Sequence, residues 1–350
     1  MAIDNKDKKI LNVPPLRFPE FSGEWKCTTI GNIGDIKNGP FGSVLHAEDY
    51  VENGIPIVTT EHFKTGLMPS DKFGIPQVSN EDYIRLKGYR LETNDIVFSR
   101  VGSVDINAHV GIEQNGWLFS GRVLRVRPKY DIDSLFLHYA LSTEAVKRDI
   151  RNRAVGQTMP SINTPILSST TIQLPKDLFE QKKVAHFLRL LDERIITQNK
   201  IIEKLQSLIK GLRVCCMQRV YGNNVYLSEI AQIYQPQTIS STELTEDGFL
   251  VYGANGIIGK YKDYNHETEQ ICITCRGNTC GMVNYTKPMS WITGNAMVIN
   301  TDKYQDKVCK RYLYHYLSAY NFNSIISGSG QPQIVRTPLG KVKNNIAHYF

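Results

Sequence analysis

The sequence lacks any long apolar run. No stretch of about 18 consecutive apolar residues occurs in its 350 residues, so no membrane-spanning helix is expected. The first ten residues are polar and lack the apolar region of a signal peptide, which favours a cytoplasmic protein. The seven cysteines are odd in number and irregularly spaced, which indicates reduced thiols rather than a disulfide framework. The net charge of +7 permits nucleic-acid binding but does not require it.

Recognisable catalytic motifs are also missing. The sequence contains neither a Walker loop nor the Asn/Asp-Pro-Pro-aromatic motif of amino-methyltransferases. Residues 253–259 have a glycine at every third position, which differs from the dinucleotide-binding fingerprint, and no apolar helix follows them. Glu24 and Lys26 form a Glu-x-Lys triplet without the acidic partner that metal-dependent cleavage needs. We therefore expect no catalytic residues and no cofactor.

Three cysteines near residue 275 raise the alternative of a zinc site. Cys272 and Cys275 lie within an apparent strand, and Cys280 follows. Strand residues three apart point to opposite faces, and no second ligand pair follows at zinc-finger spacing. The sequence therefore favours buried thiols and no metal.

A single long helix is predicted over residues 177–221. Apolar residues recur there at alternating steps of four and three, which is a heptad seam with both positions filled. The seam comprises Val184, Leu188, Leu191, Ile195, Ile202, Leu205, Ile209 and Leu212, with Gln198 as its one polar member. At 1.5 Å per residue the helix would be about 60 Å long. The alternative is a core helix of a large domain, but such helices are usually shorter and have a wider apolar face. A seam of this length needs a partner helix.

Similar sequence segments lie on both sides of this helix. Strands are predicted at residues 55–58, 95–98, 121–127 and 170–174, and a helix at residues 133–152. After the long helix, residues 227–233, 270–276, 311–318 and 330–338 resemble residues 30–36, 94–100, 135–142 and 156–165 in the same order. The second pair of segments aligns Arg276 with Arg100, and the third pair is separated by the same number of residues. Four such echoes indicate an internal repeat. The predicted fold is α/β (α+β), with two related globular domains joined by a long coiled-coil helix.

Several short motifs resemble one known family. They are the Leu16-Arg-Phe-Pro-Glu-Phe lead into Trp25, the two strand-end arginines, the two Gly-Gln…Thr-Pro segments, and the helix entry with Leu174, Pro175, Glu180, Gln181 and Lys182. With the repeat, they make the chain similar to the specificity subunit of type I restriction–modification enzymes over nearly its whole length.

The resemblance implies a non-catalytic subunit that binds double-stranded DNA. Each globular half would be a target recognition domain that reads one part of a split site. The helix would set the spacer and dock methyltransferase (M) subunits, and through them the restriction/translocase (R) subunit. We expect a disordered lead over residues 1–16, recognition domains over residues 17–175 and 223–343, the spacer helix over residues 176–222, and a truncated tail over residues 344–350.

The candidate DNA contacts are polar or basic residues in loops and at strand ends. Base edges need bidentate donors and acceptors, and phosphates need cations or amides. The candidates in the first domain are Asn38, Ser43, Thr59, Thr60, Arg100, Ser103, Gln157 and Thr158. Those in the second domain are Tyr252, Asn255, Lys260, Arg276, Asn278, Thr279 and Gln331. The alternatives are local ion pairing for Arg100 and Arg276, and turn or capping roles for Gln157 and Gln331.

The family normally adds a second long helix after the second recognition domain. Aligning Thr164 with Thr337 places Phe350 opposite Asp177, so we expect a truncated or recombined variant. Its seam would be uncovered in the monomer and would pair with a second copy, a separate fragment or partner subunits, unless the second domain folds back over it. The other function class is a single-chain nuclease or DNA methyltransferase with a duplicated fold.

Overall fold

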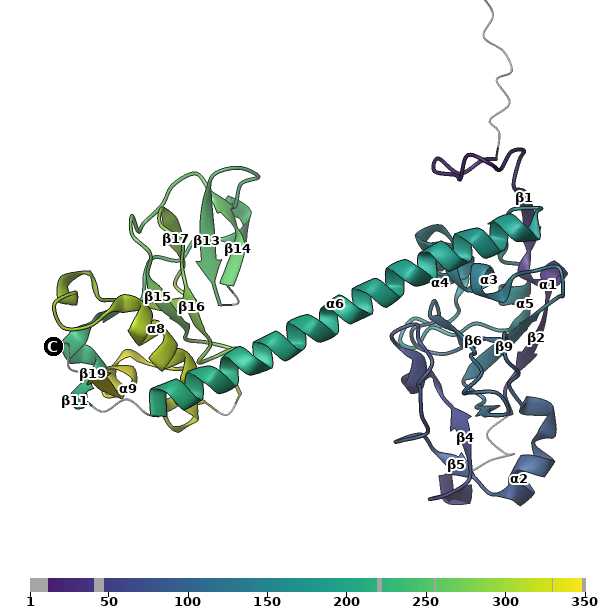
Figure 1. Ribbon diagram of the computed structural model, residues 1–350, viewed down its shortest axis with the longest axis horizontal. Helices are drawn as coiled ribbons and strands as arrows, with labels where there is room; N and C mark the ends of the chain where they lie inside the picture. Colours follow the sequence, from purple (N-terminus) through teal and green to yellow (C-terminus); the bar gives the residue numbers. More distant parts are fainter. Residues whose placement is uncertain (1–11, 41–46, 219–221, 255, 329, 348–350) are drawn as a thin grey trace, which may run out of the picture. The chain divides into compact units, whose positions relative to one another are not determined.

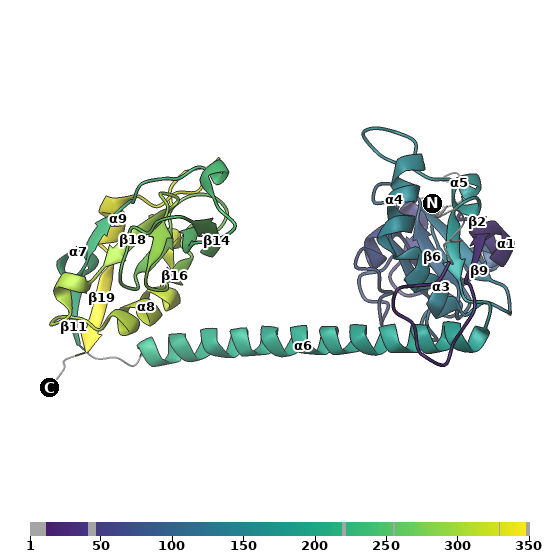
Figure 2. The same cartoon turned by 90° about the horizontal axis from the view of Figure 1, so that it is seen from above.

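The computed structural model describes residues 12–40, 47–218, 222–254, 256–328 and 330–347. The chain forms two compact units, Met1–Thr197 and Gln198–Phe350. The helix α6 (Leu178–Gln218) begins in the first unit and ends in the second, and Figure 2 shows it as one uninterrupted helix. Within the described residues no helix is both long and apolar enough to cross a membrane.

The first unit is organised around a four-stranded antiparallel sheet (Figure 1). Its strand order is β2 (Gly34–Asn38), β9 (Val123–Pro128), β6 (Ile96–Ser99) and β7 (Asn107–His109). Short helices cover one face: α1 (Ile30–Ile33), α3 (Ser134–Leu141), α4 (Glu144–Arg153) and α5 (Thr164–Ser168). Phe98, Leu124 and Val126 point to this face and are fully buried in the main core with Leu137. A pair of strands, β1 (Lys26–Thr29) and β10 (Thr171–Leu174), connects this sheet to α6.

A second, smaller sheet covers the other face. Its order is β3 (Tyr50–Val51), β5 (Gln77–Val78), β4 (Ile55–Val58) and β8 (Leu118–Phe119), with β4 and β8 parallel. The side chains of a strand alternate between its faces, so Val97 and Val123 pack with Phe119 of the small sheet rather than with the helices. The helix α2 (Asn80–Arg85) lies between β5 and β6 in the chain.

The second unit repeats this topology. Its main sheet has the order β12 (Gln232–Tyr234), β18 (Ala296–Asn300), β15 (Ile271–Thr274) and β16 (Val283–Tyr285). Its small sheet has the order β14 (Gly256–Tyr261), β13 (Phe249–Gly253) and β17 (Ser290–Ile292), with β13 and β17 parallel. The helices are α7 (Leu227–Ile230), α8 (Lys310–Ala319) and α9 (Arg336–Gly340), and β11 (Gly222–Tyr226) pairs with β19 (Lys343–Ala347). The predicted internal repeat is confirmed.

Short 3-10 helices connect some of these elements. They are η1 (Ala47–Asp49), η2 (Thr60–Phe63), η3 (Lys87–Tyr89), η4 (Ser241–Glu243), η5 (Asp302–Tyr304) and η6 (Phe322–Ile325).

The predicted strands agree with β4, β6, β9 and β10 to within two residues, and the predicted long helix is confirmed by α6. The helix expected over residues 133–152 is instead two helices, α3 and α4, because hydroxyl side chains interrupt it. The Ser142 hydroxyl donates to the His138 carbonyl at 2.9 Å, and the Thr143 hydroxyl donates to the Ala140 carbonyl at 2.8 Å. Such bonds compete with the helix backbone. The expected disordered lead does not extend through Asn12, whose side-chain amide donates to the Trp25 carbonyl at 2.8 Å.

Two buried polar residues attach the start of α6 to the first unit. The Glu180 carboxylate, 2% exposed, accepts two hydrogen bonds of 2.7 Å from Arg17 and one of 3.1 Å from Trp25 Nε1. The next residue, Gln181, is 1% exposed; its Oε1 accepts from the Asp133 backbone N–H at 2.9 Å and its Nε2 donates to the Pro175 carbonyl at 3.0 Å. The two family-like motifs, distant in sequence, are therefore in direct contact.

We predict that Gln181→Ala destabilises the first unit. The substitution leaves the buried Pro175 carbonyl and the partly buried Asp133 N–H without partners, and a buried unpaired group costs about 1–3 kcal/mol. Urea unfolding followed by circular dichroism measures the change. Gln206→Ala, on an exposed part of α6, is the matched control and should change the free energy of unfolding by less than about 0.5 kcal/mol. Equal stability of the two variants would contradict the assigned role of Gln181.

Candidate nucleic-acid interface

In the first unit, several candidate residues gather where β6 ends. Past Ser99 the chain pairs with a hairpin at residues 155–161: Val101 bridges to Ser161, and Ser161 bridges to Val155. The Gly102 N–H donates to the Pro160 carbonyl at 2.8 Å, and Gly156 turns the hairpin at a φ of +102°. The exposed side chains of Ser103, Gln157 and Thr158 lie on this strand extension and its hairpin. The backbone thus places these three candidates and Arg100 at one end of the sheet.

The second unit builds the same feature where β15 ends. Arg276 and Ser327 both bridge to Gln333, so residues 327–333 form the equivalent hairpin. The Gly277 N–H donates to the Pro332 carbonyl at 2.9 Å, and Gly328 has a φ of +95°. Around this hairpin the candidates Arg276, Asn278 and Gln331 are exposed, and Thr279 is half-buried.

The hydrogen bonds correct the register of the repeat. The Ile162 N–H donates to the Arg100 carbonyl at 2.9 Å, and the Ile334 N–H donates to the Cys275 carbonyl at 3.0 Å. Arg100 therefore corresponds to Cys275, and Arg276 corresponds to Val101. The expected equivalence of Arg100 and Arg276 is wrong by one residue, which reverses the direction of a strand side chain.

The same correction applies to the two hairpin glutamines. Counting along the equivalent hairpins, Gln331 takes the place of Met159, and the counterpart of Gln157 is residue 329, which lies outside the described residues. The two Gly-Gln pairs could be aligned in sequence because glycine occurs twice in the second hairpin. Only the strand pairing shows that Gly328 is the counterpart of Gly156.

A cavity of about 470 Å³ opens at the end of the main sheet that carries the hairpin at residues 155–161. It is lined by Thr59 and Thr60, which follow β4, and by Arg100. The Arg100 Nη1 donates to the Gly121 carbonyl at 3.0 Å. Ser120 and Arg122 also line the cavity, and sequence reasoning missed both. Both lie at or directly before the start of the strand predicted at residues 121–127. Their position could have indicated them, because that strand pairs with the strand that precedes Arg100.

Five further candidates have different outcomes. Tyr252 is 5% exposed in a core cluster with Cys272, and its hydroxyl accepts from the Lys287 N–H at 3.1 Å, so its expected DNA contact is wrong. Lys260 is half-buried, with its Nζ 3.6 Å from an Asp247 carboxylate oxygen. Asn38 has a buried Oδ1 without a partner in the described structure. Ser43 and Asn255 lie outside the described residues.

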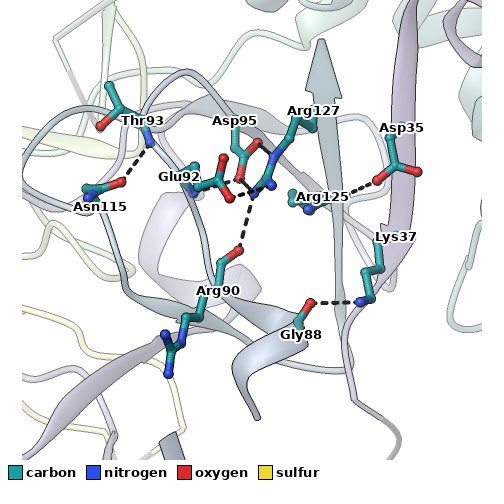
Figure 3. A network of polar contacts seen from close by, with 10 residues as sticks. All are labelled: Asp35, Lys37, Gly88, Arg90, Glu92, Thr93, Asp95, Asn115, Arg125 and Arg127. Carbon is teal, nitrogen blue, oxygen red and sulfur yellow. Dashed lines mark hydrogen bonds and ion pairs between the residues drawn. The ribbon is translucent and has the colours of Figure 1, made fainter. Parts of the chain in front are cut away.

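Other arginines of the first unit are neutralised within the fold (Figure 3). Arg127 on β9 donates to both carboxylate oxygens of Asp95, at 2.7 and 2.8 Å, and to Glu92 at 2.6 Å. The hydrogen bonds to buried Asp95 raise the pKa of Arg127. Arg125 pairs with Asp35, and burial lowers the pKa of Arg125. Because these charges are compensated internally, they are poor candidates for phosphate contacts.

The cysteine geometry agrees with the preference for buried thiols. Cys272 packs in the cluster with Tyr252, whereas Cys275 packs in the main core of the second unit with Ile273 and Leu313. Burial raises the pKa of Cys272 to about 12 and also raises the pKa of Cys275. The two side chains therefore occupy different clusters, as their strand spacing predicts.

The helix α6 exposes a broad apolar stripe. The exposed seam residues, each between 42% and 58% accessible, are Leu191, Ile195, Ile202, Leu205, Ile209 and Leu212. Val184 and Leu188 instead line a cavity of the first unit with Trp25 and Phe136, so the expectation of a wholly uncovered seam is wrong at its first two positions.

Sequence reasoning also missed part of the stripe. Phe187, Leu190, Ile201 and Leu208, each directly preceding a seam residue, are likewise exposed. They were missed because only the two seam positions of each heptad were counted, and they make the apolar face wider than a two-position seam.

Comparison with known proteins places both units in one family. The model of the type I restriction modification DNA specificity domain matches residues 22–207 and 223–346. A putative type I restriction enzyme MjaX specificity subunit of Methanocaldococcus jannaschii is 32% identical over 254 residues, covering 68% of this chain and 56% of that protein. The MjaVIII specificity subunit of the same organism is 27% identical over 222 residues, covering 63% of this chain and 47% of that protein. The chain thus spans about half the length of these curated relatives.

The fold agrees with solved structures. The crystal structure of a type I restriction–modification system S subunit from M. genitalium matches with a TM-score of 0.62 at 18% identity, covering 93% of this chain and 85% of that one. A structure from work on complex assembly of the type I system matches with a TM-score of 0.51 at 15% identity, covering 95% and 87%. Because the family model covers both units, the chain belongs to the family of type I restriction–modification DNA specificity domains.

Proposed function

We propose that this chain is the DNA-recognition subunit of a type I restriction–modification complex. Each unit reads one half of a bipartite duplex site, and α6 sets the spacer and docks methyltransferase subunits, through which the restriction subunit joins. The chain itself carries out no catalytic step. The observation that carries the proposal is the repeated strand-end hairpin, which presents polar side chains at the same place in both units.

The side chains at these hairpins suit groove recognition. Arginine donates two parallel hydrogen bonds to guanine, asparagine and glutamine pair with adenine, and threonine can contact either base. The first unit offers Gln157 and Thr158, and the second offers Arg276, Asn278 and Gln331, all of them exposed. The two hairpins thus present different residues, which would give the two halves different sequence preferences.

The other function class has less support. A single-chain nuclease or methyltransferase would need acid–base or metal-binding groups at the repeated site. The candidate positions there hold arginine, glutamine, asparagine and threonine, and the matching relatives are named specificity subunits.

The proposal predicts a split DNA motif with a fixed gap. Methylome sequencing of cells that express this chain with a methyltransferase subunit should reveal such a motif. It should disappear when the chain is omitted, because the methyltransferase then lacks sequence recognition. A continuous motif, or methylation that does not depend on this chain, would contradict the proposal.

We predict that Arg276→Ala weakens recognition of one half-site. If the guanidinium contacts a guanine, its loss costs about 1–3 kcal/mol of binding free energy and relaxes specificity at one position. Arg276→Lys should lose most of the same discrimination, because lysine lacks the planar pair of donors. Binding assays with duplexes altered in either half measure the effect.

A matched control separates this effect from general damage. Arg148→Ala removes the same charge from the exposed face of α4 and should leave discrimination unchanged. Equal loss of recognition at both halves in Arg276→Ala would show that the variant is unfolded rather than impaired in base reading.

The apolar stripe of α6 supports self-association or pairing with a partner helix. Nine large apolar side chains from Leu190 to Leu212 are at least 42% exposed, a surface too extensive to remain in water unpaired. Those from Ile201 onward lie within the second unit and remain exposed there, so the second domain does not cover that part of the seam.

We predict that the purified chain forms dimers or larger species through this stripe. Ile202→Glu with Ile209→Glu places two charges in the seam and should yield a monomer in light scattering. Asn199→Glu with Ser207→Glu adds the same charge to exposed polar positions of α6 outside the stripe and should leave the association intact. A monomeric native chain would contradict the prediction.

A further inference from the structure

The cavity beside β6 concentrates positive charge without compensation. Arg100 and Arg122 line it together, and the Arg100 N–H donates to the Arg122 carbonyl at 3.0 Å, so the two residues are neighbours across β6 and β9. The one carboxylate in the lining, Glu61, lies 2.5 Å from Lys64 Nζ. The Arg122 side chain has no ion pair or hydrogen bond to the described part of the chain. Two guanidinium groups that share a cavity repel each other unless an anion lies between them.

Two buried polar atoms in this cavity also lack partners. Arg100 Nε and Ser120 Oγ are inaccessible to solvent and make no hydrogen bond to the residues that the structure describes. Buried polar atoms are nearly always hydrogen-bonded, so each unpaired one requires an explanation. Both belong to residues that line the same cavity, where a change of side-chain rotamer would bring either atom to a bound acceptor.

The second unit shows that the fold does not need these arginines. The Cys275 N–H donates to the Asn295 carbonyl at 3.2 Å, the bond equivalent to that between Arg100 and Arg122. Cys275 and Asn295 therefore replace the two arginines. Thr293, the counterpart of Ser120, has a satisfied hydroxyl, which accepts from the Ile239 N–H at 3.2 Å. The same corner of the fold is thus complete without a cation or an unpaired hydroxyl.

We propose that this cavity of the first unit binds a backbone phosphate of DNA. Arg100 and Arg122 supply the charge, and the hydroxyls of Ser120, Thr59 and Thr60 supply further donors. A phosphate suits the cavity better than a base edge, because Arg100 Nη1 is already bonded to the Gly121 carbonyl and the side chain is half-buried. A guanidinium held in this way positions a charge but does not extend into a groove. The inference rests on the proposed DNA-binding function.

The test compares Arg122→Gln with Arg148→Gln in the full chain assembled with a methyltransferase subunit. Both variants remove one exposed arginine of the first unit. Affinity for duplex DNA is measured over a series of salt concentrations, with matched and mismatched first half-sites. A phosphate contact contributes about 0.9 to the slope of log affinity against log salt. Arg122→Gln should therefore reduce the magnitude of that slope by about 1 and weaken binding by the same factor for every sequence, whereas Arg148→Gln should not.

Other results would overturn the inference in distinguishable ways. An unchanged slope in Arg122→Gln, with native DNA binding intact, would remove the phosphate site and leave the proposed function standing. A loss confined to one base position would assign the cavity to base reading. Absence of duplex binding by the native assembly would overturn the proposed function as well.

A second measurement, thermal unfolding in inorganic phosphate, separates the polymer from a free anion. Stabilisation by phosphate that Arg122→Gln abolishes, combined with unaltered DNA affinity, would assign the cavity to a small anion and overturn the inference.

Discussion

The buried carboxylate of Glu180 determines how α6 attaches to the first unit. It binds Arg17 and Trp25 from the start of the described chain, while Gln181 beside it holds the backbone of Asp133 and Pro175. A buried charge is tolerated only when it is paired and hydrogen-bonded, so these partners must be in place together. The beginning of the chain, the segment before α3 and the first turn of α6 consequently form one connected structure.

The two units show how one fold accommodates different polar chemistry. Asp95 binds Arg127 in the first unit, and Gln270, at the equivalent position before the central strand, binds Thr268 and Asp302 in the second. Both residues are 1% exposed and both donate or accept side-chain hydrogen bonds although the charge has changed, but the Gln270 Oε1 has no partner among the described residues. The two units therefore keep the same topology although a buried position holds a charged side chain in one unit and a neutral polar one in the other.

The sequence was sufficient for the long helix and the repeat, because heptad spacing and recurring text reflect backbone periodicity. The sequence did not determine to which face of a strand each side chain points. The alignment of Arg100 with Arg276 ignored a one-residue difference that only strand pairing reveals, and Tyr252 resembled a loop residue although β13 buries it. The break between α3 and α4 depends on the hydroxyls of Ser142 and Thr143, which helix periodicity does not register. Cavity residues such as Arg122 were missed because their proximity is tertiary.

The strand-end hairpins separate stability from recognition. The hairpin at residues 155–161 keeps its shape through backbone bonds from Val155, Gly102 and Ser161, whereas its tip side chains are exposed and add nothing to the core. Substitutions at Gln157, Thr158 or Met159 therefore cost little folding free energy, and proteins tolerate changes that leave them above a stability threshold. If the hairpins read DNA as proposed, new preferences can arise by drift at a few surface positions, one unit at a time, while the scaffold remains intact.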